Sequence, residues 1–236
     1  YYYDETHYKR ELEAFWYRHW ICVGRHDDIT AIGDYRVVEV GDQSVVVTRD
    51  NSGAIRAFYN TCRHRGSVLC EAERGRFNGG RIVCPYHAWT YSLEGELEKT
   101  PWRLPSDDFR FQEFPLYRVG AVEWAGYVFI NLDHDSDASL SDVLKTMPER
   151  FANWRLETTK VAHHLDIELE CNWKIFWENF DECYHCPGVH PELCQVVPTF
   201  GKGYSSPSEN PAWQPPDPSN TDYVEPRLAP GAVTWS

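Results

Sequence analysis

The chain has 236 residues, enough for one large domain or two modest ones, and its 42% hydrophobic and 15% aromatic content is typical of a folded protein with a sizeable core. A formal net charge of −13 argues against binding to nucleic acid or to an anionic membrane surface. No apolar run approaches the ~20 residues needed to cross a bilayer, and the polar start is unlike a signal peptide, so we expect a cytoplasmic protein. Because the chain does not begin with Met, we also expect its natural N-terminus to be trimmed or missing.

The first part of the chain predicts one helix followed by short antiparallel strands. Residues 5–20 carry large apolar side chains near helical spacing, which indicates an amphipathic helix. Residues 35–40 and 44–48 alternate polar and apolar side chains, and Gly41-Asp42 between them is typical of a hairpin turn. Residues 54–59 predict a third strand, which leads into the first of two motifs that contain Cys and His.

Each of these motifs offers one thiolate and one imidazole: Cys62-Arg63-His64 and Cys84-Pro85-Tyr86-His87. Predicted strands at 81–83 and 90–93 enter and leave the second motif, so we expect it on a loop. Two Cys and two His are the ligands of a Rieske [2Fe–2S] cluster, in which two imidazoles replace two thiolates on one iron. This replacement raises the reduction potential above that of an all-Cys ferredoxin. The motifs therefore predict an electron relay.

A structural zinc site is the alternative interpretation of the same four residues. The Cys-x-His spacing is shorter than the usual zinc spacing, and Gly66 and Pro85 are typical of tight loops folded over a cluster. Tyr86 and Trp89 could shield such a cluster from water. The chain is large and lacks a secretory signal, so reduced thiols rather than disulfides are expected at Cys22, Cys70, Cys171 and Cys194.

Further strands and helices follow. Residues 117–123 and 127–132 predict a hairpin, and the acidic stretch 133–138 predicts a linker. Residues 140–154 predict a helix, and alternation over 161–170, which puts His164, Asp166 and Glu168 on one side, predicts a strand. An aromatic-rich buried helix is expected at 173–184, with a stop at Pro187-Gly188. Residues 207–230, rich in Pro, Ser, Asp and Asn, fit either a disordered linker or a long ordered loop over a site.

An acid and two histidines lie around the end of that last helix. Glu182 and His185 are three residues apart and would share one helix face. His185 and His190 would point about 140° apart on a continuous helix, but a break at Pro187-Gly188 lets His190 turn back toward His185. Two imidazoles so placed suit a mononuclear non-haem Fe(II), which binds two His and one carboxylate and keeps other positions open.

Three neighbours of these residues need an interpretation as well. Asp181 is four residues from His185 and therefore competes with Glu182 for the place beside this imidazole. Cys183 and Cys186 have the spacing of a redox or zinc pair, but beside the two histidines we interpret them as structural.

The segments Cys-Arg-His-Arg-Gly at 62–66 and Cys-Pro-Tyr-His-Ala-Trp at 84–89 resemble the α subunit of Rieske non-haem iron oxygenases, and the resemblance covers nearly the whole chain. The 19 residues between His64 and Cys84 are more than is usual in this family, but the polar stretch 71–80 can absorb an insertion at little cost. The resemblance implies an α+β fold in three parts. These are an N-terminal helical segment (1–33) that packs on the catalytic domain, an antiparallel β Rieske domain (34–133), and the N-terminal part of a helix-grip catalytic domain (134–236).

The resemblance also implies roles for the site residues. The [2Fe–2S] ligands are Cys62, His64, Cys84 and His87, and the mononuclear Fe(II) ligands in this chain are His185 and His190. Glu182 is implied as the carboxylate that bridges an iron-binding His toward His87 of a neighbouring subunit. The family takes its third iron ligand, a carboxylate, from far downstream. The late acids, which are Asp217, Asp222 and Glu225, lie in Pro-rich sequence and are not assigned to this role. We therefore expect a C-terminally truncated chain.

The function implied is that of the terminal oxygenase component of a multi-component Rieske enzyme. A reductase, with or without a ferredoxin, takes electrons from NAD(P)H, and the oxygenase uses them with O₂ to oxidise a small organic substrate. A homotrimer or an α3β3 assembly is expected. The segment Glu-Cys-Tyr-His-Cys at 182–186 is similar to the branch that hydroxylates or N-demethylates quaternary ammonium compounds, for which an aromatic cage would suit the cation. The alternatives are an aromatic ring-hydroxylating dioxygenase and, from another class, a Rieske-type electron carrier.

Overall fold

The computed structural model describes residues 1–101, 106–134 and 138–204. These residues belong to two compact units, each of which is described by itself. The first unit is Glu5–Leu165, and the second combines Tyr1–Asp4 with the chain from Asp166 onward. Within the described ranges, no helix has the length and apolar character needed to span a membrane.

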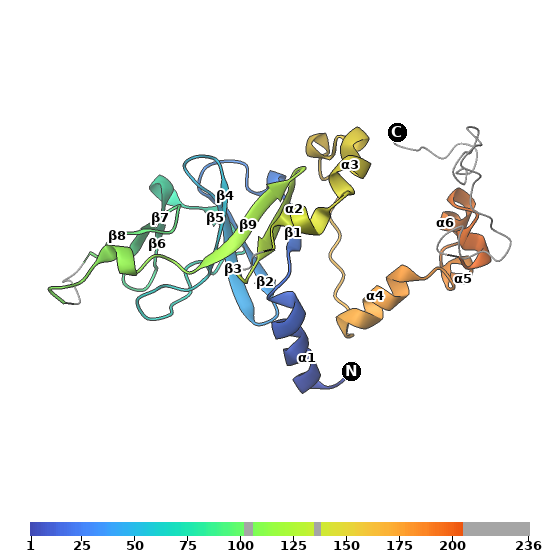
Figure 1. Ribbon diagram of the computed structural model, residues 1–236, viewed down its shortest axis with the longest axis horizontal. Helices are drawn as coiled ribbons and strands as arrows, with labels where there is room; N and C mark the ends of the chain where they lie inside the picture. Colours follow the sequence, from blue (N-terminus) through green and yellow to red (C-terminus); the bar gives the residue numbers. More distant parts are fainter. Residues whose placement is uncertain (102–105, 135–137, 205–236) are drawn as a thin grey trace. The chain divides into compact units, whose positions relative to one another are not determined.

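Two antiparallel sheets form the first unit (Figure 1). The seven-stranded sheet has the order β1 (Ile21–Arg25), β10 (Tyr127–Asn131), β9 (Arg118–Trp124), β4 (Ile55–Tyr59), β3 (Gln43–Arg49), β2 (Asp34–Val40) and β5 (Arg74–Arg76). The small sheet has the order β6 (Arg81–Val83), β7 (Thr90–Ser92) and β8 (Leu97–Lys99). The predicted strands and both predicted hairpins of this region are confirmed, with ends shifted by one or two residues.

The two faces of β3 show how the sheet is packed. Val46 points into a core shared with Phe58 of β4 and with Ile82 and Tyr91 of the small sheet. Val45 and Val47 point to the opposite face, into a second core that contains Ile130 of β10. Successive side chains of a strand alternate between faces, so a run of three valines fills two cores at once. The first core also contains the thiols of both Cys-His motifs.

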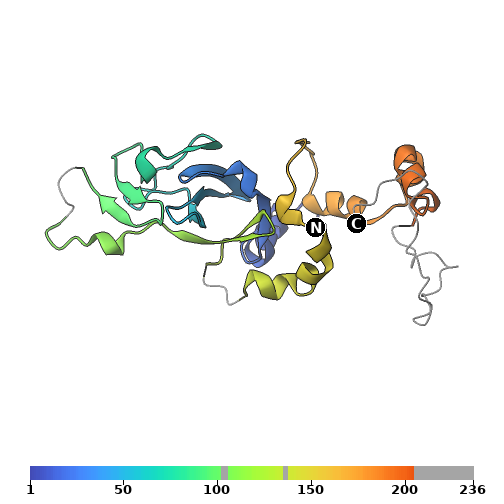
Figure 2. The ribbon, with the colours of Figure 1, turned by 90° about the horizontal axis from the view of Figure 1, so that it is seen from above.

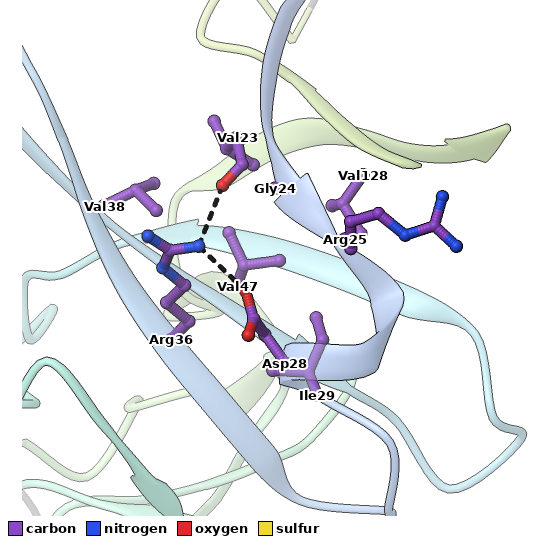
Figure 3. Close-up of a pocket in the computed structure, with 9 residues that line it drawn as sticks. All are labelled: Val23, Gly24, Arg25, Asp28, Ile29, Arg36, Val38, Val47 and Val128. Atoms are coloured by element: carbon purple, nitrogen blue, oxygen red, sulfur yellow. Dashed lines mark hydrogen bonds and ion pairs between the residues drawn. The ribbon is translucent and has the colours of Figure 1, made fainter. Parts of the chain in front are cut away.

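Strand β1 belongs to the large sheet, so part of the N-terminal segment 1–33 is integral to that sheet. The boundaries of the three predicted parts (1–33, 34–133 and 134–236) stay predictions. Its pairing with β10 is interrupted by a bulge between Cys22 and Gly24. The side chain of Arg36, on β2, donates to the carbonyl of the bulged Val23 at 3.2 Å and to the Asp28 carboxylate at 3.0 Å (Figure 3). Arg36 therefore joins the two strands beside a small pocket that is mostly lined by apolar side chains.

The helices of the first unit are shorter than predicted. The N-terminal helix α1 (Glu5–Glu11) continues as a π-helical turn over Leu12–Trp16 and ends there rather than at residue 20. The predicted helix 140–154 is broken into α2 (Leu140–Leu144), α3 (Met147–Phe151) and a 3₁₀ turn. The break falls at Lys145, which has a positive φ of 47°, because Pro148 has no N–H to donate to the Leu144 carbonyl and its ring would clash with that carbonyl in a continuous helix. In Figures 1 and 2 α2 and α3 lie at the end of this unit opposite the small sheet.

The second unit contains α4 (Trp173–Asp181), α5 (Cys186–Val189) and α6 (Pro191–Val196). The predicted strand at 161–170 is wrong, since this segment is exposed and pairs with no strand among the described residues. The helix predicted at 173–184 is confirmed over α4 but ends at Asp181, and no residue of α4 is buried. The Pro-rich residues 207–230 lie outside the described residues.

Short 3₁₀ turns complete the described parts of both units: His26–Asp28, Asn78–Gly80, Phe111–Glu113 and Leu156–Thr158 in the first unit, and Phe200–Lys202 in the second.

Candidate metal centres

The first Cys-His motif lies on a tightly hydrogen-bonded loop that leaves β4. The backbone N–H of Cys62 donates to the carbonyl of Ser67 at 2.8 Å, and the N–H of Gly66 donates to the carbonyl of Cys62 at 2.9 Å. Gly66 has a φ of +70°, a backbone conformation that glycine adopts without strain. The loop therefore folds back on itself around Cys62 and His64, as the position of Gly66 in the sequence predicted.

A buried asparagine fastens this loop to the sheet. The Oδ1 of Asn60 accepts hydrogen bonds from the N–H groups of Leu69 and Cys70 at 3.1 and 2.9 Å. Its Nδ2 donates to the Cys70 carbonyl at 2.8 Å and to the Ser44 hydroxyl at 3.1 Å. Asn60 is only 3% exposed, so its amide replaces water for three backbone groups at the far end of the loop.

The second motif lies on the connection between β6 and β7. The N–H of Cys84 donates to the carbonyl of Trp89 at 2.8 Å, and the N–H of Ala88 donates to the carbonyl of Cys84 at 3.0 Å. Ala88 takes a positive φ of 54° to close this loop. The predicted arrangement of strand, motif and strand is confirmed here.

The two thiols lie together inside the protein. Cys62 and Cys84 are each 2% exposed, and the two thiols lie close enough for Cys84 to affect the pKa of Cys62. Burial raises the pKa of the Cys62 thiol, and the Cys84 thiol raises it further. The hydroxyl of Tyr91 lies 3.3 Å from the Sγ of Cys62. The loops thus bring two sulfur donors to one buried position.

The two imidazoles form a matching pair. The ring centroids of His64 and His87 are 4.9 Å apart, and His64 stacks on the indole of Trp89 at 4.7 Å. Burial, with smaller contributions from His87 and Arg65, lowers the pKa of His64 and so favours the neutral ring that can bind a metal. The Nδ1 of His87 is buried and has no hydrogen-bond partner among the described residues. An unsatisfied buried nitrogen of this kind is a suitable metal ligand.

These observations fit a cluster with two sulfur and two nitrogen ligands. Over residues 1–101, 106–134 and 138–204, no group of three or more His, Cys, Asp or Glu side chains gathers around a single ion position. The ligands come instead as one thiol pair and one imidazole pair, and a Rieske cluster binds one such pair through each of its irons.

Three side chains that support these loops were not singled out from the sequence: Asn60, Arg63 and Tyr91. The guanidinium of Arg63 donates to the Pro115 carbonyl at 2.9 Å and lies 4.1 Å from the centroid of the Tyr117 ring. Tyr91 follows Trp89 by two residues in the segment that leaves the second motif, so alternation along a strand could have placed the two side chains on the same side. No comparable local pattern indicates the partners of Asn60, because its contacts depend on how the loop folds back.

The second constellation begins where α4 ends. Asn172 caps the start of α4, and its side chain accepts a hydrogen bond from the Lys174 N–H at 3.1 Å. Glu182 follows Asp181 with extended backbone, so it does not share a helix face with His185 as predicted. Its Oε1 nevertheless lies 2.5 Å from the Nδ1 of His185, and its Oε2 accepts the N–H of Tyr184. The His185 hydrogen bond is the main reason that the pKa of Glu182 is lowered.

His185 and His190 flank the short helix α5, and their ring centroids are 5.3 Å apart. Pro187 lies in the first turn of α5, where proline is tolerated, so it does not end a helix as predicted. The chain turns earlier, directly after α4. The two imidazoles could hold one metal ion together with a carboxylate from elsewhere. The late acids Asp217, Asp222 and Glu225 lie outside the described residues, and the roles of all predicted site residues stay predictions.

Comparison with known proteins gives matches over both parts of the chain. Residues 19–114 match the Rieske [2Fe-2S] domain, and residues 151–234 match the ring hydroxylating alpha subunit (catalytic domain). The glycine betaine monooxygenase oxygenase subunit of Chromohalobacter salexigens is 37% identical over 193 residues, which are 82% of this chain and 42% of that protein. The carnitine monooxygenase oxygenase subunit of Escherichia coli is 31% identical over 229 residues, which are 89% of this chain and 59% of that protein.

Solved structures give the same picture. The quaternary ammonium Rieske monooxygenase CntA in complex with L-carnitine matches with a TM-score of 0.73 and 32% identity over 80% of this chain and 53% of that one. A naphthalene 1,2-dioxygenase with bound indole matches with a TM-score of 0.68 and 27% identity over 91% of this chain and 48% of that one. The chain thus spans about half the length of the relatives it matches. With a Rieske domain followed by part of a ring-hydroxylating catalytic domain, the chain belongs to the α subunits of Rieske non-haem iron oxygenases.

Proposed function

We propose that this chain is the Rieske part and the first portion of the catalytic domain of a terminal oxygenase. The observation that carries the proposal is the pairing of two buried thiols with two imidazoles on adjacent loops: Cys62 with Cys84, and His64 with His87. An electron carrier would need these four ligands alone. His185, His190 and the catalytic-domain match over 151–234 favour the oxygenase instead.

Each metal site depends on specific contacts made by residues of this chain. When bound, the cluster supplies one-electron transfer, and the two-histidine iron supplies activation of dioxygen. Burial of both thiols keeps water from the sulfur ligands, and Trp89 stacks on His64. Glu182 holds the Nδ1 of His185, which fixes the ring orientation and leaves Nε2 for the metal. Glu182 would also connect His185 to His87 of a neighbouring subunit in a trimer, either α3 or α3β3.

Quaternary ammonium compounds are the substrate class we propose, with hydroxylation or N-demethylation as the reaction. Relatives named for glycine betaine and for carnitine support this class at 37% and 31% identity. An aromatic ring is the second candidate, because naphthalene 1,2-dioxygenase matches the same fold at 27% identity. In either case we propose that a reductase supplies electrons from NAD(P)H, directly or through a ferredoxin.

Metal analysis of the full-length protein tests the proposal. A terminal oxygenase should contain about three irons and two sulfides per chain, a carrier about two irons, and a zinc protein zinc without sulfide. Depletion of glycine betaine, carnitine or naphthalene by the protein with a reductase and NAD(P)H then tests the substrate class. Zinc without sulfide would contradict the proposed function. If naphthalene were the only compound oxidised, the assignment as a terminal oxygenase would stand, but the proposed quaternary ammonium substrate class would be wrong.

A further inference from the structure

Cys183 and Cys186 lie at the two ends of one tight turn. The backbone N–H of Cys186 donates to the carbonyl of Cys183 at 3.0 Å, with Tyr184 and His185 in the middle of the turn. A hydrogen-bonded turn holds its terminal Cα atoms within about 7 Å, and disulfides span Cα distances of about 4.4–6.8 Å. The backbone therefore already has the separation that a disulfide needs.

The two thiols differ in exposure in the way that suits stepwise oxidation. Cys183 is half-buried and can be reached by a small oxidant, whereas Cys186 is 3% exposed. A reachable thiol reacts first, and a shielded neighbour then resolves the oxidised sulfur before it is oxidised further. A third thiol of the same unit, Cys194, lies on α6 and provides a matched comparison.

We propose that Cys183 and Cys186 form a reversible dithiol–disulfide pair that constrains the turn carrying His185. The oxidant we name is hydrogen peroxide. The Cys183 sulfur attacks one peroxide oxygen, the O–O bond breaks, and the products are a sulfenic acid and water. The Cys186 sulfur then attacks the sulfenic sulfur, its proton leaves with the hydroxyl as a second water, and the S–S bond forms. Two thiols and one peroxide thus give one disulfide and two waters.

The consequence for the metal site rests on the proposed function. Glu182 contacts both residues inside the turn, because its Oε1 meets the Nδ1 of His185 and its Oε2 accepts the N–H of Tyr184. A disulfide draws the two Cβ atoms to about 3.8 Å and encloses Tyr184 and His185 in one small ring. Closing this ring should shift Tyr184 and His185 relative to the Glu182 carboxylate that contacts both. Loss of a carboxylate that orients a ligand lowers metal affinity by about 10–100-fold.

The test uses full-length protein that is reduced, treated with one equivalent of hydrogen peroxide, alkylated under denaturing conditions and mapped by mass spectrometry. Wild type should lose two alkylatable cysteines, and the peptide that links Cys183 to Cys186 should lack two hydrogen atoms. Dithiothreitol should restore both. Cys194→Ser should form the same link, and Cys186→Ser should not. A link from Cys183 to Cys194, or irreversible oxidation of both thiols without a link, would overturn the pair.

Binding of Co²⁺ to the reduced and oxidised forms tests the coupling to His185. Oxidised wild type should bind Co²⁺ about 10-fold more weakly than reduced wild type, and Cys186→Ser should show no such change. Equal affinities in wild type would overturn the coupling. If reduced protein bound no Co²⁺ while the disulfide still formed, the proposed iron site would be at fault and the thiol pair would stand.

Discussion

The hydroxyl of Tyr91 lies between two atoms of the first metal-binding loop. Its oxygen accepts the backbone N–H of Arg63 at 3.2 Å and lies 3.3 Å from the Sγ of Cys62. A cluster-bound Cys62 would be a thiolate without a hydrogen, so the Tyr91 hydroxyl would then donate its own hydrogen to the sulfur. Tyr91 is fully buried, so water cannot replace this contact.

Tyr91→Phe should therefore lower the reduction potential of the cluster, because a hydrogen bond to a ligand sulfur stabilises the added electron. The same change should cost about 1 kcal/mol of unfolding free energy. A redox titration followed by the Rieske electron paramagnetic resonance signal measures the potential. Tyr86→Phe is the control, since Tyr86 is 62% exposed. Equal shifts in both variants would show that the Tyr91 hydroxyl has no particular role.

Asn60→Ala should loosen the loop that carries Cys62 and His64. It removes four hydrogen bonds and leaves the N–H groups of Leu69 and Cys70 buried without their partner. An unsatisfied buried group costs about 1–3 kcal/mol, so a loss of about 3 kcal/mol or more is expected by urea unfolding. Iron and sulfide content should fall as well. The control is Asn51→Ala, whose side-chain amide donates to the carboxylate of Glu94 in an exposed turn. A fully loaded and stable Asn60→Ala protein would contradict this prediction.

Protonation of Asp50 should lower the free energy of unfolding in acid. Burial by itself would raise the pKa of Asp50, but hydrogen bonds from the side chains of Ser52 and Arg56 and from the N–H groups of Ala54 and Ser52 lower it below its ordinary value. A lowered pKa in the folded state adds stability above about pH 4, and this is lost as the pH falls through the folded pKa. Asp50→Asn should remove that part of the pH dependence, measured by urea unfolding between pH 3 and pH 7. The exposed Glu13→Gln serves as the control, and a wild-type slope in Asp50→Asn would count against the assignment.

His185→Ala or His190→Ala, made in the full-length protein, should lower the iron content by about one per chain, because a site with one remaining imidazole binds iron weakly. Substrate oxidation should stop, and the Rieske signal should remain. His163→Ala in the exposed segment 161–170 is the matched control. Loss of the cluster signal in the His185 or His190 variant would mean that the residue is structural.

Glu182→Gln separates metal binding from electron transfer. The amide can still contact the Nδ1 of His185, so both metal sites should stay occupied, but the charge that links His185 toward the cluster is lost. Stopped-flow measurement on pre-reduced protein with substrate and O₂ should therefore show slower reoxidation of the cluster. Asp181→Asn is the comparison. Normal reoxidation in Glu182→Gln with slow reoxidation in Asp181→Asn would reverse the choice between the two acids.

The sequence predicted correctly those parts of the structure that are formed by residues close together along the chain. Cys62 with His64 and Cys84 with His87 lie on loops whose ends are fixed by neighbouring strands, so spacing and turn residues such as Gly66 carried the prediction. The hairpin of β2 and β3 was equally visible, because a two-residue turn sets its register. Strand β1 was missed because it pairs with β10, more than a hundred residues away, and a bulge at Val23 obscures its alternation.

Tertiary structure decided the segments from 140 onward. Alternation at 161–170 was real in the sequence, but a strand needs a hydrogen-bonded partner, and the described residues supply none, so Leu165 and Ile167 stay 71% and 67% exposed. The aromatic residues of α4 predicted burial, yet burial depends on an opposing surface rather than on composition. The amino-acid sequence by itself determined which side chains can bind metal. Their pairing across loops was decided by the fold, because Asn60, Tyr91 and Glu182 act through contacts that only the folded backbone creates.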